Sequence, residues 1–375
     1  MGRRLRSGLV GFGWVSRSVW LPRLQQHPDC DMVAVHDPYL TTPVAGLTRV
    51  GSLGQLVEAG LDLAVVATPN HLHAEAAGFL LSAGVPVVVE KPLCLSSAEL
   101  AGLVRQATQG RVGFQVSRPA PRRHDVEQLT ALVAQLLVGP VQVHATWLRR
   151  QGVPRPGSWF TRRAQAGGGA LVDLGWHLAD VAAGLLGEAA LAQVDATLTT
   201  GADASALQAA WRRDDPGRTA TDAVVDVETD GELRARFTDG STLYLRAAWA
   251  CDVAVDTTRF EVRGRTADGR DAVLTLETTF GFSPNRVAEP FLETRVGDRS
   301  TRLPVTAPIG AEFDRQVAAT VLLADQERTD TAELRRSAWV LGLLETAYRV
   351  AGRPLTPDAP QAVVEVPVAR VAVRG

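Results

Sequence analysis

The sequence predicts two domains: an α/β domain built on a parallel sheet, then an α+β domain built on a mainly antiparallel sheet. The chain has 375 residues, which is too long for one ordinary hydrophobic core. Its first 120 residues alternate short β-branched runs with amphipathic stretches, the pattern of βαβ units. Beyond about residue 125, alternating strands joined by Asp-Gly turns indicate antiparallel pairing. We therefore divide the chain into residues 1–120 and 121–375.

The first domain follows from five apolar strands separated by helices. The strands are predicted at Leu5 to Val10, Met32 to His36, Leu63 to Ala67, Val85 to Val89 and Arg111 to Val116. The helices are predicted near Val15 to Gln26, His73 to Ala83 and Ser97 to Thr108. Ligands of such sheets bind at the carboxyl edge of the strands, so the residues that follow each strand are the first candidates for a site.

The second domain begins with a helix from Asp125 to Val138, stopped by Gly139-Pro140. An alternating strand, a Pro/Gly-rich loop and an apolar helix are expected next, at Val141 to Arg149, Gly152 to Gly157, and from the Gly167-Gly168-Gly169 turn to about Leu186. Further strands are expected near Ala223 to Glu228, Glu232 to Thr238, Thr242 to Trp249 and Arg259 to Arg265, with turns at Asp230-Gly231 and Asp239-Gly240.

The remaining segments are a loop, a helical region and a tail. Residues 201–220 are rich in Ala and Asp and are expected to form a loop. A long helical region over residues 312–351, broken near Thr329, is expected to pack back on the first domain. The tail from Val363 to Val373 alternates and is expected to form an edge strand or an arm that reaches another subunit. A homodimer or homotetramer is therefore expected.

The composition favours a small-molecule partner. A net charge of -2 argues against nucleic acid or an anionic membrane, since both favour a basic face. No apolar run reaches membrane-spanning length and the N-terminus lacks the pattern of a signal peptide, so a cytoplasmic location is expected. The three widely spaced cysteines are interpreted as buried side chains in a reducing compartment.

The first dense motif is a glycine turn that follows the first strand, and it indicates a dinucleotide site. In Gly11-Phe12-Gly13-Trp14-Val15-Ser16, Gly11 permits the tight turn and Gly13 allows a pyrophosphate to approach the backbone. Asp37, at the end of the second strand, would accept hydrogen bonds from a ribose and repel a 2′-phosphate. NAD is therefore expected rather than NADP, although Arg49 could serve a 2′-phosphate. A glycine turn without a ligand is the alternative.

The third strand ends in Thr68-Pro69-Asn70 followed by His73, where the nicotinamide half of the cofactor should lie. Asn70 and His73 are candidate polar contacts to cofactor or substrate. Asn and His are also frequent at helix ends, so a capping role is equally open.

The fourth strand leads into Glu90 and Lys91, and Lys91 is the single lysine of a chain that has 38 arginines. Arginine stays protonated at any working pH, whereas a lysine can release a proton when its surroundings lower its pKa. Chance would place the lone lysine at this position about once in 39. We therefore interpret Lys91 as a proton-transferring group.

The second dense motif runs from Gly167 through Asp173 and His177 to Asp180. On a helix these three polar residues share one face, and the carboxylate could orient the imidazole for acid/base chemistry. A capping Asp and a satisfied core His are the alternative. We expect no metal site, because the ligand spacing of zinc sites is absent, and no serine hydrolase, because GxSxG is absent.

Together, these motifs in this order resemble the glucose-fructose oxidoreductase/inositol dehydrogenase (Gfo/Idh/MocA) family. The resemblance rests on Gly11-x-Gly13-x-x-Ser16, Thr68-Pro69-Asn70-x-x-His73, Glu90-Lys91-Pro92 and Gly167-Gly-Gly-x-Leu-x-Asp173-x-Gly175-x-His177-x-x-Asp180. It implies an N-terminal Rossmann domain, a C-terminal domain with a large open antiparallel sheet, a nicotinamide cofactor and a sugar, aminosugar or cyclitol substrate. The chain departs from the family after the fifth strand, where it has Gln115-Val116-Ser117-Arg118.

The resemblance also implies roles for individual residues. The catalytic lysine, aspartate and histidine fall on Lys91, Asp173 and His177, with His177 as the expected acid/base, Lys91 on the reacting oxygen and Asp173 orienting both. Exchanged roles for Lys91 and His177 stay open. Contacts to the cofactor fall on Gly11, Phe12, Gly13, Trp14, Val15, Asp37, Thr68, Pro69, Asn70, His73 and Glu90.

Further substrate contacts are expected near the second motif. The aromatic side chains of Trp159, Phe160 and Trp176 could stack on a sugar, and the guanidinium groups of Arg162 and Arg163 could hold an anionic group. The alternative is that these side chains pack within a loop or are solvated. We expect a dehydrogenase or reductase acting on a secondary alcohol or ketone, with natural-product biosynthesis as a setting. A glycoside-cleaving enzyme with transient oxidation by NAD and a non-enzymatic nucleotide-sensing regulator are the alternatives.

Overall fold

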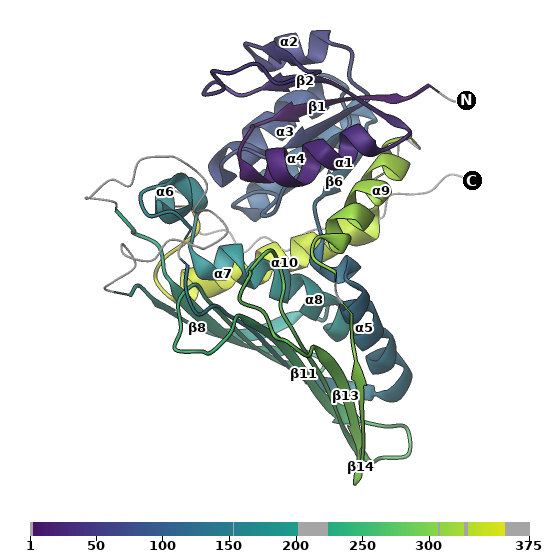
Figure 1. The fold of residues 1–375 in the computed structure, drawn as a ribbon. Helices are drawn as coiled ribbons and strands as arrows, with labels where there is room; N and C mark the ends of the chain where they lie inside the picture. Colours follow the sequence, from purple (N-terminus) through teal and green to yellow (C-terminus); the bar gives the residue numbers. More distant parts are fainter. Residues whose placement is uncertain (1–2, 153, 202–223, 307, 326–328, 357–375) are drawn as a thin grey trace.

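The computed structural model describes residues 3–152, 154–201, 224–306, 308–325 and 329–356 (Figure 1). Six strands form a parallel sheet in the order β3-β2-β1-β4-β5-β6. They are β1 Leu5–Val10, β2 Cys30–His36, β3 Thr48–Val50, β4 Leu63–Val66, β5 Val87–Val89 and β6 Phe114–Val116. All residues of β4, β5 and β6 are buried, because helices cover both faces of the sheet. This strand order is that of a Rossmann fold.

Short helices connect these strands. They are a π-helical turn η1 Ser16–Trp20, α1 Leu21–Gln26, α2 Leu53–Glu58, η2 Asn70–Leu72, α3 His73–Ser82 and α4 Ser97–Gly110. A capping box between Ser96 and Glu99 starts α4. The sequence did not predict β3 or α2, since β3 has three mostly exposed residues and α2 only one buried side chain.

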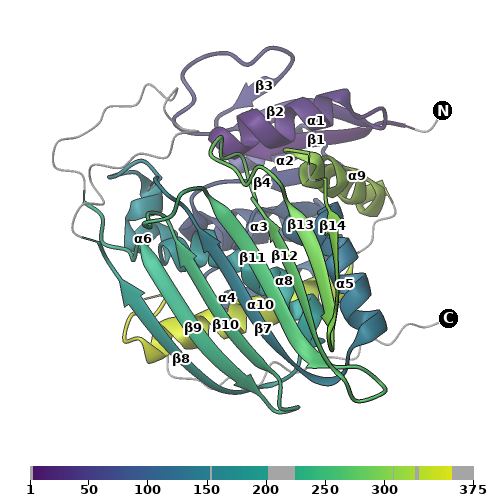
Figure 2. The same ribbon diagram turned by 60° about the horizontal axis from the view of Figure 1, so that its bottom comes forward.

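The second sheet has eight strands in the order β14-β13-β12-β11-β7-β10-β9-β8, as Figure 2 shows. They are β7 Val138–Leu148, β8 Leu191–Thr199, β9 Asp230–Phe237, β10 Thr242–Ala248, β11 Thr257–Arg265, β12 Asp271–Thr278, β13 Phe291–Val296 and β14 Arg299–Pro304. Strands β7 and β10 pair in parallel, and the other neighbours are antiparallel. The fold class predicted from the sequence is therefore confirmed.

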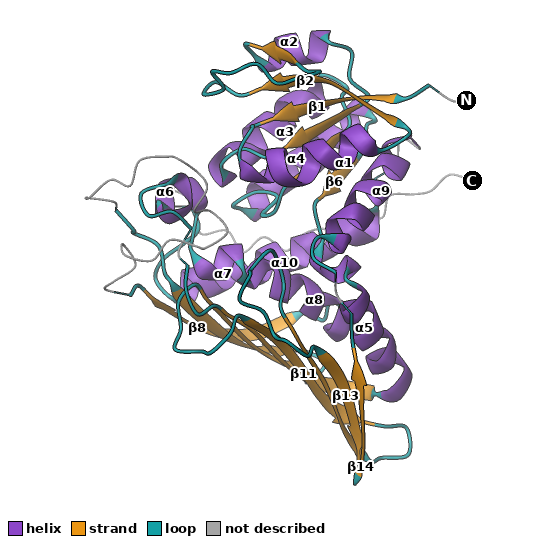
Figure 3. Cartoon of the chain, viewed as in Figure 1, coloured by secondary structure: helices purple, strands orange, loops and turns teal. Residues whose placement is uncertain are grey.

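One face of this sheet is covered by helices and faces the first domain (Figures 1 and 3). Alternate residues of β7 (Val141, Val143, Ala145 and Trp147) are buried against these helices. The covering helices are α5 His124–Leu136, α8 Gly175–Leu186 and α10 Thr331–Val350. Short segments η3 Ala120–Arg122, η4 Trp159–Thr161, α6 Arg163–Ala166 and α7 Ala170–Asp173 lead toward the first domain.

Helix α9, Ala311–Asp325, returns to the first domain. Its side chains Val317 and Val321 join the apolar cluster that contains Leu9 and Trp20. The two parts of the chain are thereby held together by a shared core as well as by the connection after β6. Within the described residues, no single helix is long and apolar enough to cross a membrane.

Several predicted elements of the second domain differ from the structure. Asp230-Gly231 begins β9 rather than forming a turn, and residues 224–228 before it form no strand. Helix α5 ends at Leu136, and Gly139-Pro140 lie inside β7. Strands β8, β12, β13 and β14 were not predicted. The tail at 363–373 and nearly all of the loop at 201–220 lie outside the described residues.

Candidate active site

A cavity of about 630 Å³ lies between the carboxyl edge of the parallel sheet and the helices of the second domain. This size is typical of small-molecule sites. The ends of β1, β2, β4 and β5 contribute residues from the first domain, and β7, α7 and α8 contribute residues from the second. Its lining includes Gly11, Gly13, Trp14, Val15, Asp37, Thr68, Pro69, Asn70, His73, Glu90, Lys91, Trp147, Arg149, Arg155, Trp159, Phe160, Asp173 and His177.

The glycine turn after β1 is shaped to accept a ligand close to its backbone. Gly11 has a φ of +87°, and a Cβ there would lie 2.6 Å from the carbonyl oxygen of Ala67. A Cβ on Gly13 would meet no atom within 4 Å, so a side chain at this position would occupy the cavity. The turn therefore fits a dinucleotide pyrophosphate, as the sequence predicts.

Asp37 is held beside this turn at the end of β2. Its carboxylate accepts hydrogen bonds from the backbone N–H of Phe12, at 2.7 Å, and of Tyr39, at 2.8 Å. Asp37 lines the cavity, and each of its oxygens has a further lone pair that can accept a ribose hydroxyl. Phe12 itself does not line the cavity, and its ring packs against the apolar cluster around Trp20.

In the segment after β4, the side chains of Asn70 and His73 bond to backbone carbonyls of the protein. The ring nitrogens of His73 lie 2.7 Å from the carbonyl of Pro92 and 2.9 Å from that of Thr68, and burial lowers the pKa of His73 to about 4. The Asn70 amide donates to the carbonyl of Ala166 at 2.9 Å, which ties this turn to α6. Both side chains thus brace the cavity wall, although both positions line it.

Lys91 meets Asp173 across the two domains. Its ammonium donates to Oδ1 of Asp173 at 2.9 Å and to the Asp173 carbonyl at 3.0 Å, while Oδ2 accepts from the Trp249 indole at 3.1 Å. Burial alone would raise the pKa of Asp173, but Lys91, assisted by Arg149 and Trp249, lowers that pKa to about 2. The carboxylate of Asp173 is therefore ionised at neutral pH. Glu90 accepts from the Trp20 indole at 2.7 Å and anchors the strand end beside Lys91.

His177 lies beside this pair without bonding to Asp173. The sequence places the two residues one turn apart on one helix, but α7 ends at Asp173 and α8 begins at Gly175. The chain bends by 51° between the segment Arg163–Asp173 and α8. Within the described residues His177 has no hydrogen-bond partner, and its ring lies 5.8 Å from that of Trp147. Burial, with the positive charge of Lys91, lowers the pKa of His177 to about 3, so the imidazole is neutral at neutral pH.

Asp180, the last polar residue of the motif, does not line the cavity. It accepts two hydrogen bonds from the buried guanidinium of Arg118, one of them 2.8 Å from Nε. Arg118 lies where the sequence departs from the family pattern. This buried pair connects the end of β6 to α8 and is structural.

The expected substrate contacts divide into two groups. Trp159 and Phe160 line the cavity and stack on each other, with ring centroids 3.9 Å apart and planes at 26°. Arg162, Arg163 and Trp176 do not line it. Arg162 is exposed, Arg163 donates to the carbonyl of Pro354 at 2.7 Å, and Trp176 is buried in the core.

The sequence did not single out Trp147, Arg149, Arg155 or Trp249. Trp147 and Arg149 occupy alternate positions at the end of the predicted strand, so its inward face could have indicated them. Trp249 reaches Asp173 because β10 pairs in parallel with β7, with Ala247 opposite Trp147. No local signal reveals that non-consecutive pairing.

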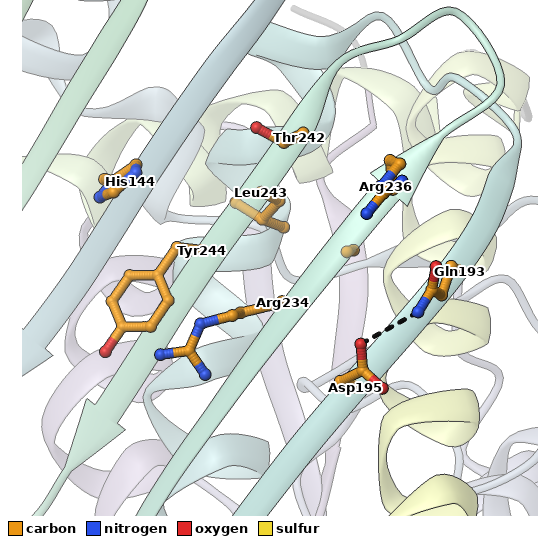
Figure 4. A pocket seen from close by; sticks show the side chains of 9 residues that line it. His144, Gln193, Asp195, Arg234, Arg236, Thr242, Leu243 and Tyr244 are labelled. Atoms are coloured by element: carbon orange, nitrogen blue, oxygen red, sulfur yellow. Dashed lines mark hydrogen bonds between the residues drawn. The ribbon is translucent and has the colours of Figure 1, made fainter.

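A second, shallower hollow of about 480 Å³ lies on the outer face of the eight-stranded sheet. Figure 4 shows His144, Gln193, Asp195, Arg234 and Tyr244 around it. It contains none of the residues predicted for the site. In the described part of the chain, no group of three His, Cys, Asp or Glu side chains is placed to hold a metal ion.

Comparisons with known proteins agree with this arrangement. Residues 5–117 match the model of the oxidoreductase family with an NAD-binding Rossmann fold, and residues 126–268 match that of the GFO/IDH/MocA C-terminal domain. A protein of Amycolatopsis mediterranei (strain S699), named as a candidate oxidoreductase subunit of a UDP-kanosamine synthase, is 41% identical over 360 residues, which cover 93% of this chain and 96% of that protein.

Solved structures share the fold. GenD2 from gentamicin A biosynthesis, in complex with NAD, has a TM-score of 0.71 at 24% identity, covering 94% of this chain and 95% of that one. KijD10, a 3-ketoreductase from Actinomadura kijaniata in complex with NADP and TDP-benzene, has a TM-score of 0.73 at 20% identity, covering 92% and 98%. The chain therefore belongs to the Gfo/Idh/MocA family of oxidoreductases, with an NAD-binding Rossmann domain at its N-terminus.

Proposed function

We propose that this oxidoreductase uses NAD to convert a secondary hydroxyl of a UDP-linked hexose, at C3, into a ketone. The observation that carries the proposal is the ion pair of Lys91 and Asp173, with neutral His177 beside it, in the lining of the same cavity as the glycine turn. These groups can bind an alcohol oxygen and accept its proton.

The residues present fit NAD at the first-domain end of the cavity. The turn at Gly11 and Gly13 would hold the pyrophosphate and Asp37 the adenosine ribose. Arg49 does not line the cavity, and the Asp37 carboxylate would repel a 2′-phosphate, which favours NAD over NADP. When bound, NAD supplies the carbon that accepts the hydride.

Lys91 is proposed to hold the reacting oxygen. An ammonium has three N–H donors, and two of them reach Asp173. The third can donate to the substrate oxygen and stabilise the charge that develops there as the hydroxyl proton leaves. Asp173 would keep the ammonium in place, together with Trp249.

His177 is proposed to accept the hydroxyl proton at a ring nitrogen. Its lowered pKa keeps the imidazole neutral, so a ring nitrogen has a lone pair toward which the hydroxyl proton can move, and it also makes that nitrogen a weak base, so the proton passes on to solvent. In ketone reduction a proton from solvent would pass to the oxygen through the same nitrogen. In the exchanged assignment Lys91 accepts the proton, and His177→Asn should then leave kcat nearly unchanged.

The charge of the substrate end favours an anionic substrate. Lys91, Arg149 and Arg155 line it, against the carboxylates of Glu90 and Asp173. Guanidinium groups bind diphosphates through paired hydrogen bonds, and the stacked rings of Trp159 and Phe160 offer an apolar surface to a base or a sugar face. The name of the Amycolatopsis relative supports a UDP-linked sugar, and the ketoreductase name of KijD10 supports C3. The ketone product is the kind of group that an aminating enzyme converts to an amine.

A cofactor-reduction assay tests the proposal. Purified protein with NAD should form NADH from UDP-glucose faster than from glucose or myo-inositol. Hydroxylamine should be present to trap the ketone, because alcohol oxidation by NAD is unfavourable at neutral pH. If NADH forms from free sugars and not from UDP-glucose, the substrate is not a UDP-linked sugar. Glycoside cleavage without net NADH, or NAD binding without turnover of any substrate, would overturn it.

A further inference from the structure

The short helix that carries Asp173 is held at its start by a buried glutamate. Glu228 accepts hydrogen bonds at Oε1 from the backbone N–H of Gly169, at 2.8 Å, and of Leu171, at 3.0 Å. Its own carbonyl accepts from the N–H of Ala170 at 3.1 Å. The first N–H groups of a helix have no partners within the helix, so this one residue satisfies three of them at the start of α7.

The glutamate is held in turn by Tyr348 of α10, whose hydroxyl donates to the same Oε1. Both side chains are 1% exposed, and burial raises the pKa of Glu228. The glycines of the motif make this approach possible. A Cβ on Gly168 would lie 2.2 Å from the Tyr348 hydroxyl, and one on Gly169 would lie 1.9 Å from the Glu228 carbonyl oxygen.

The next residue, Thr229, is connected through Trp249 to Asp173 at the other end of α7. The Thr229 carbonyl accepts from the backbone N–H of Trp249 at 2.9 Å, and the Trp249 indole donates to Oδ2 of Asp173. Within the helix, the N–H of Asp173 donates to the carbonyl of Gly169 at 2.9 Å. Glu228 therefore bonds the start of α7 directly, and Thr229 is connected to its last residue through Trp249.

We propose that Glu228, held by Tyr348, is a positioning residue that sets Asp173 against Lys91. Neither side chain lines the cavity, so both act through Asp173. The role in catalysis rests on the proposed function, whereas the positioning itself is a property of the fold.

Glu228→Ala should lower kcat about 10²-fold and leave the KM for NAD unchanged, because a small displacement of a catalytic group costs this much. Glu228→Gln should recover most of that loss, since its amide oxygen still accepts from Gly169 and Leu171. Tyr348→Phe keeps the volume of the ring and loses one hydrogen bond, and it should lower kcat about tenfold.

The chain offers a matched control on the outer face of the same sheet. Tyr244 donates to Oε2 of Glu232 at 3.0 Å, and Figure 4 shows Tyr244 beside His144 and Arg234 at the outer-face hollow. Tyr244→Phe removes the same kind of hydrogen bond and should leave kcat unchanged.

Because Lys91 is the single lysine, one further readout does not depend on turnover. Protein with isotope-labelled lysine side chains gives one lysine side-chain NMR signal, which reports the contact with Asp173. That signal should move in Glu228→Ala and Tyr348→Phe, and stay in place in Tyr244→Phe and largely in Glu228→Gln.

The outcomes separate the two proposals. A wild-type protein that turns over no sugar would refute the proposed function, while the lysine signal would still decide the positioning role. If Glu228→Ala does not fold, Tyr348→Phe decides alone. A Tyr348→Phe protein with an unchanged lysine signal and unchanged kcat would overturn the inference.

Discussion

The two ends of the cavity are built in different ways. At the cofactor end, Gly11, Asp37 and Thr68 each follow a strand of one parallel sheet, so their places follow from consecutive βαβ units. At the substrate end, β7, β10, α7 and α8 meet through pairings of elements that are distant in the sequence. The cofactor end is thus encoded locally, and the substrate end depends on long-range packing.

The two ends also differ in charge. Asp37 is the acidic group expected to contact the adenosine ribose of the cofactor, and it is already oriented by two backbone N–H groups. At the substrate end, Lys91, Arg149 and Arg155 outnumber the carboxylates of Glu90 and Asp173. Changes there should therefore act on turnover and substrate affinity, whereas changes at the cofactor end should act on the choice of dinucleotide.

The largest effect is expected from Lys91→Arg. The planar guanidinium cannot reproduce two bonds to Asp173 together with one to the substrate oxygen, so kcat should fall about 10³-fold. Calorimetry should give an unchanged Kd for NAD. The control is Arg265→Lys, which replaces an exposed arginine by lysine. It should change neither kcat nor the Kd for NAD. Wild-type turnover in Lys91→Arg would refute the role of the lysine.

His177→Asn should lower kcat about 10²-fold, since it removes the proposed proton acceptor. In the wild-type protein, the pKa of about 3 keeps His177 neutral as the pH falls through the ordinary histidine range. In the wild-type protein, kcat/KM should therefore show no decrease near pH 6.5 that is caused by protonation of His177. The profiles of wild-type protein and His177→Asn should have the same shape in that range. Finding such a decrease in the wild-type profile only would contradict this environment for the imidazole.

Arg155→Gln should raise the KM for UDP-glucose about thirtyfold and leave the KM for a free sugar unchanged, because a charge-assisted contact to the diphosphate would be lost. Initial rates with both substrates measure this difference. Arg162→Gln is the matched control, since Arg162 is exposed and outside the cavity. Equal effects of the two variants would argue against diphosphate binding at Arg155.

The smallest effect is expected at the other end. Asp37→Ser should shift the ratio of kcat/KM for NAD to that for NADP about tenfold toward NADP, because the repelling carboxylate is lost. The sugar KM should stay the same. An unchanged ratio would show that another group selects the dinucleotide.

The same difference explains what could be predicted from the sequence. The glycine turn, Asp37 and Lys91 were found because each motif is contiguous and follows a strand. The bend between Asp173 and Gly175 escaped prediction, since helical spacing alone places Asp173 and His177 on one face. Four strands of the second sheet were missed, among them β14, whose six residues are all exposed and therefore show no alternation. Trp249 was missed because its partner Asp173 lies 76 residues away in the sequence.

The most direct test of the central claim is to follow the hydride. UDP-glucose carrying deuterium at C3 should be incubated with the protein, NAD and hydroxylamine, and the reduced cofactor analysed by mass spectrometry. Our account predicts deuterium in the NADH from this substrate and none from UDP-glucose labelled at C2 or C4. Label transferred from C2 or C4, or from no position, would contradict it.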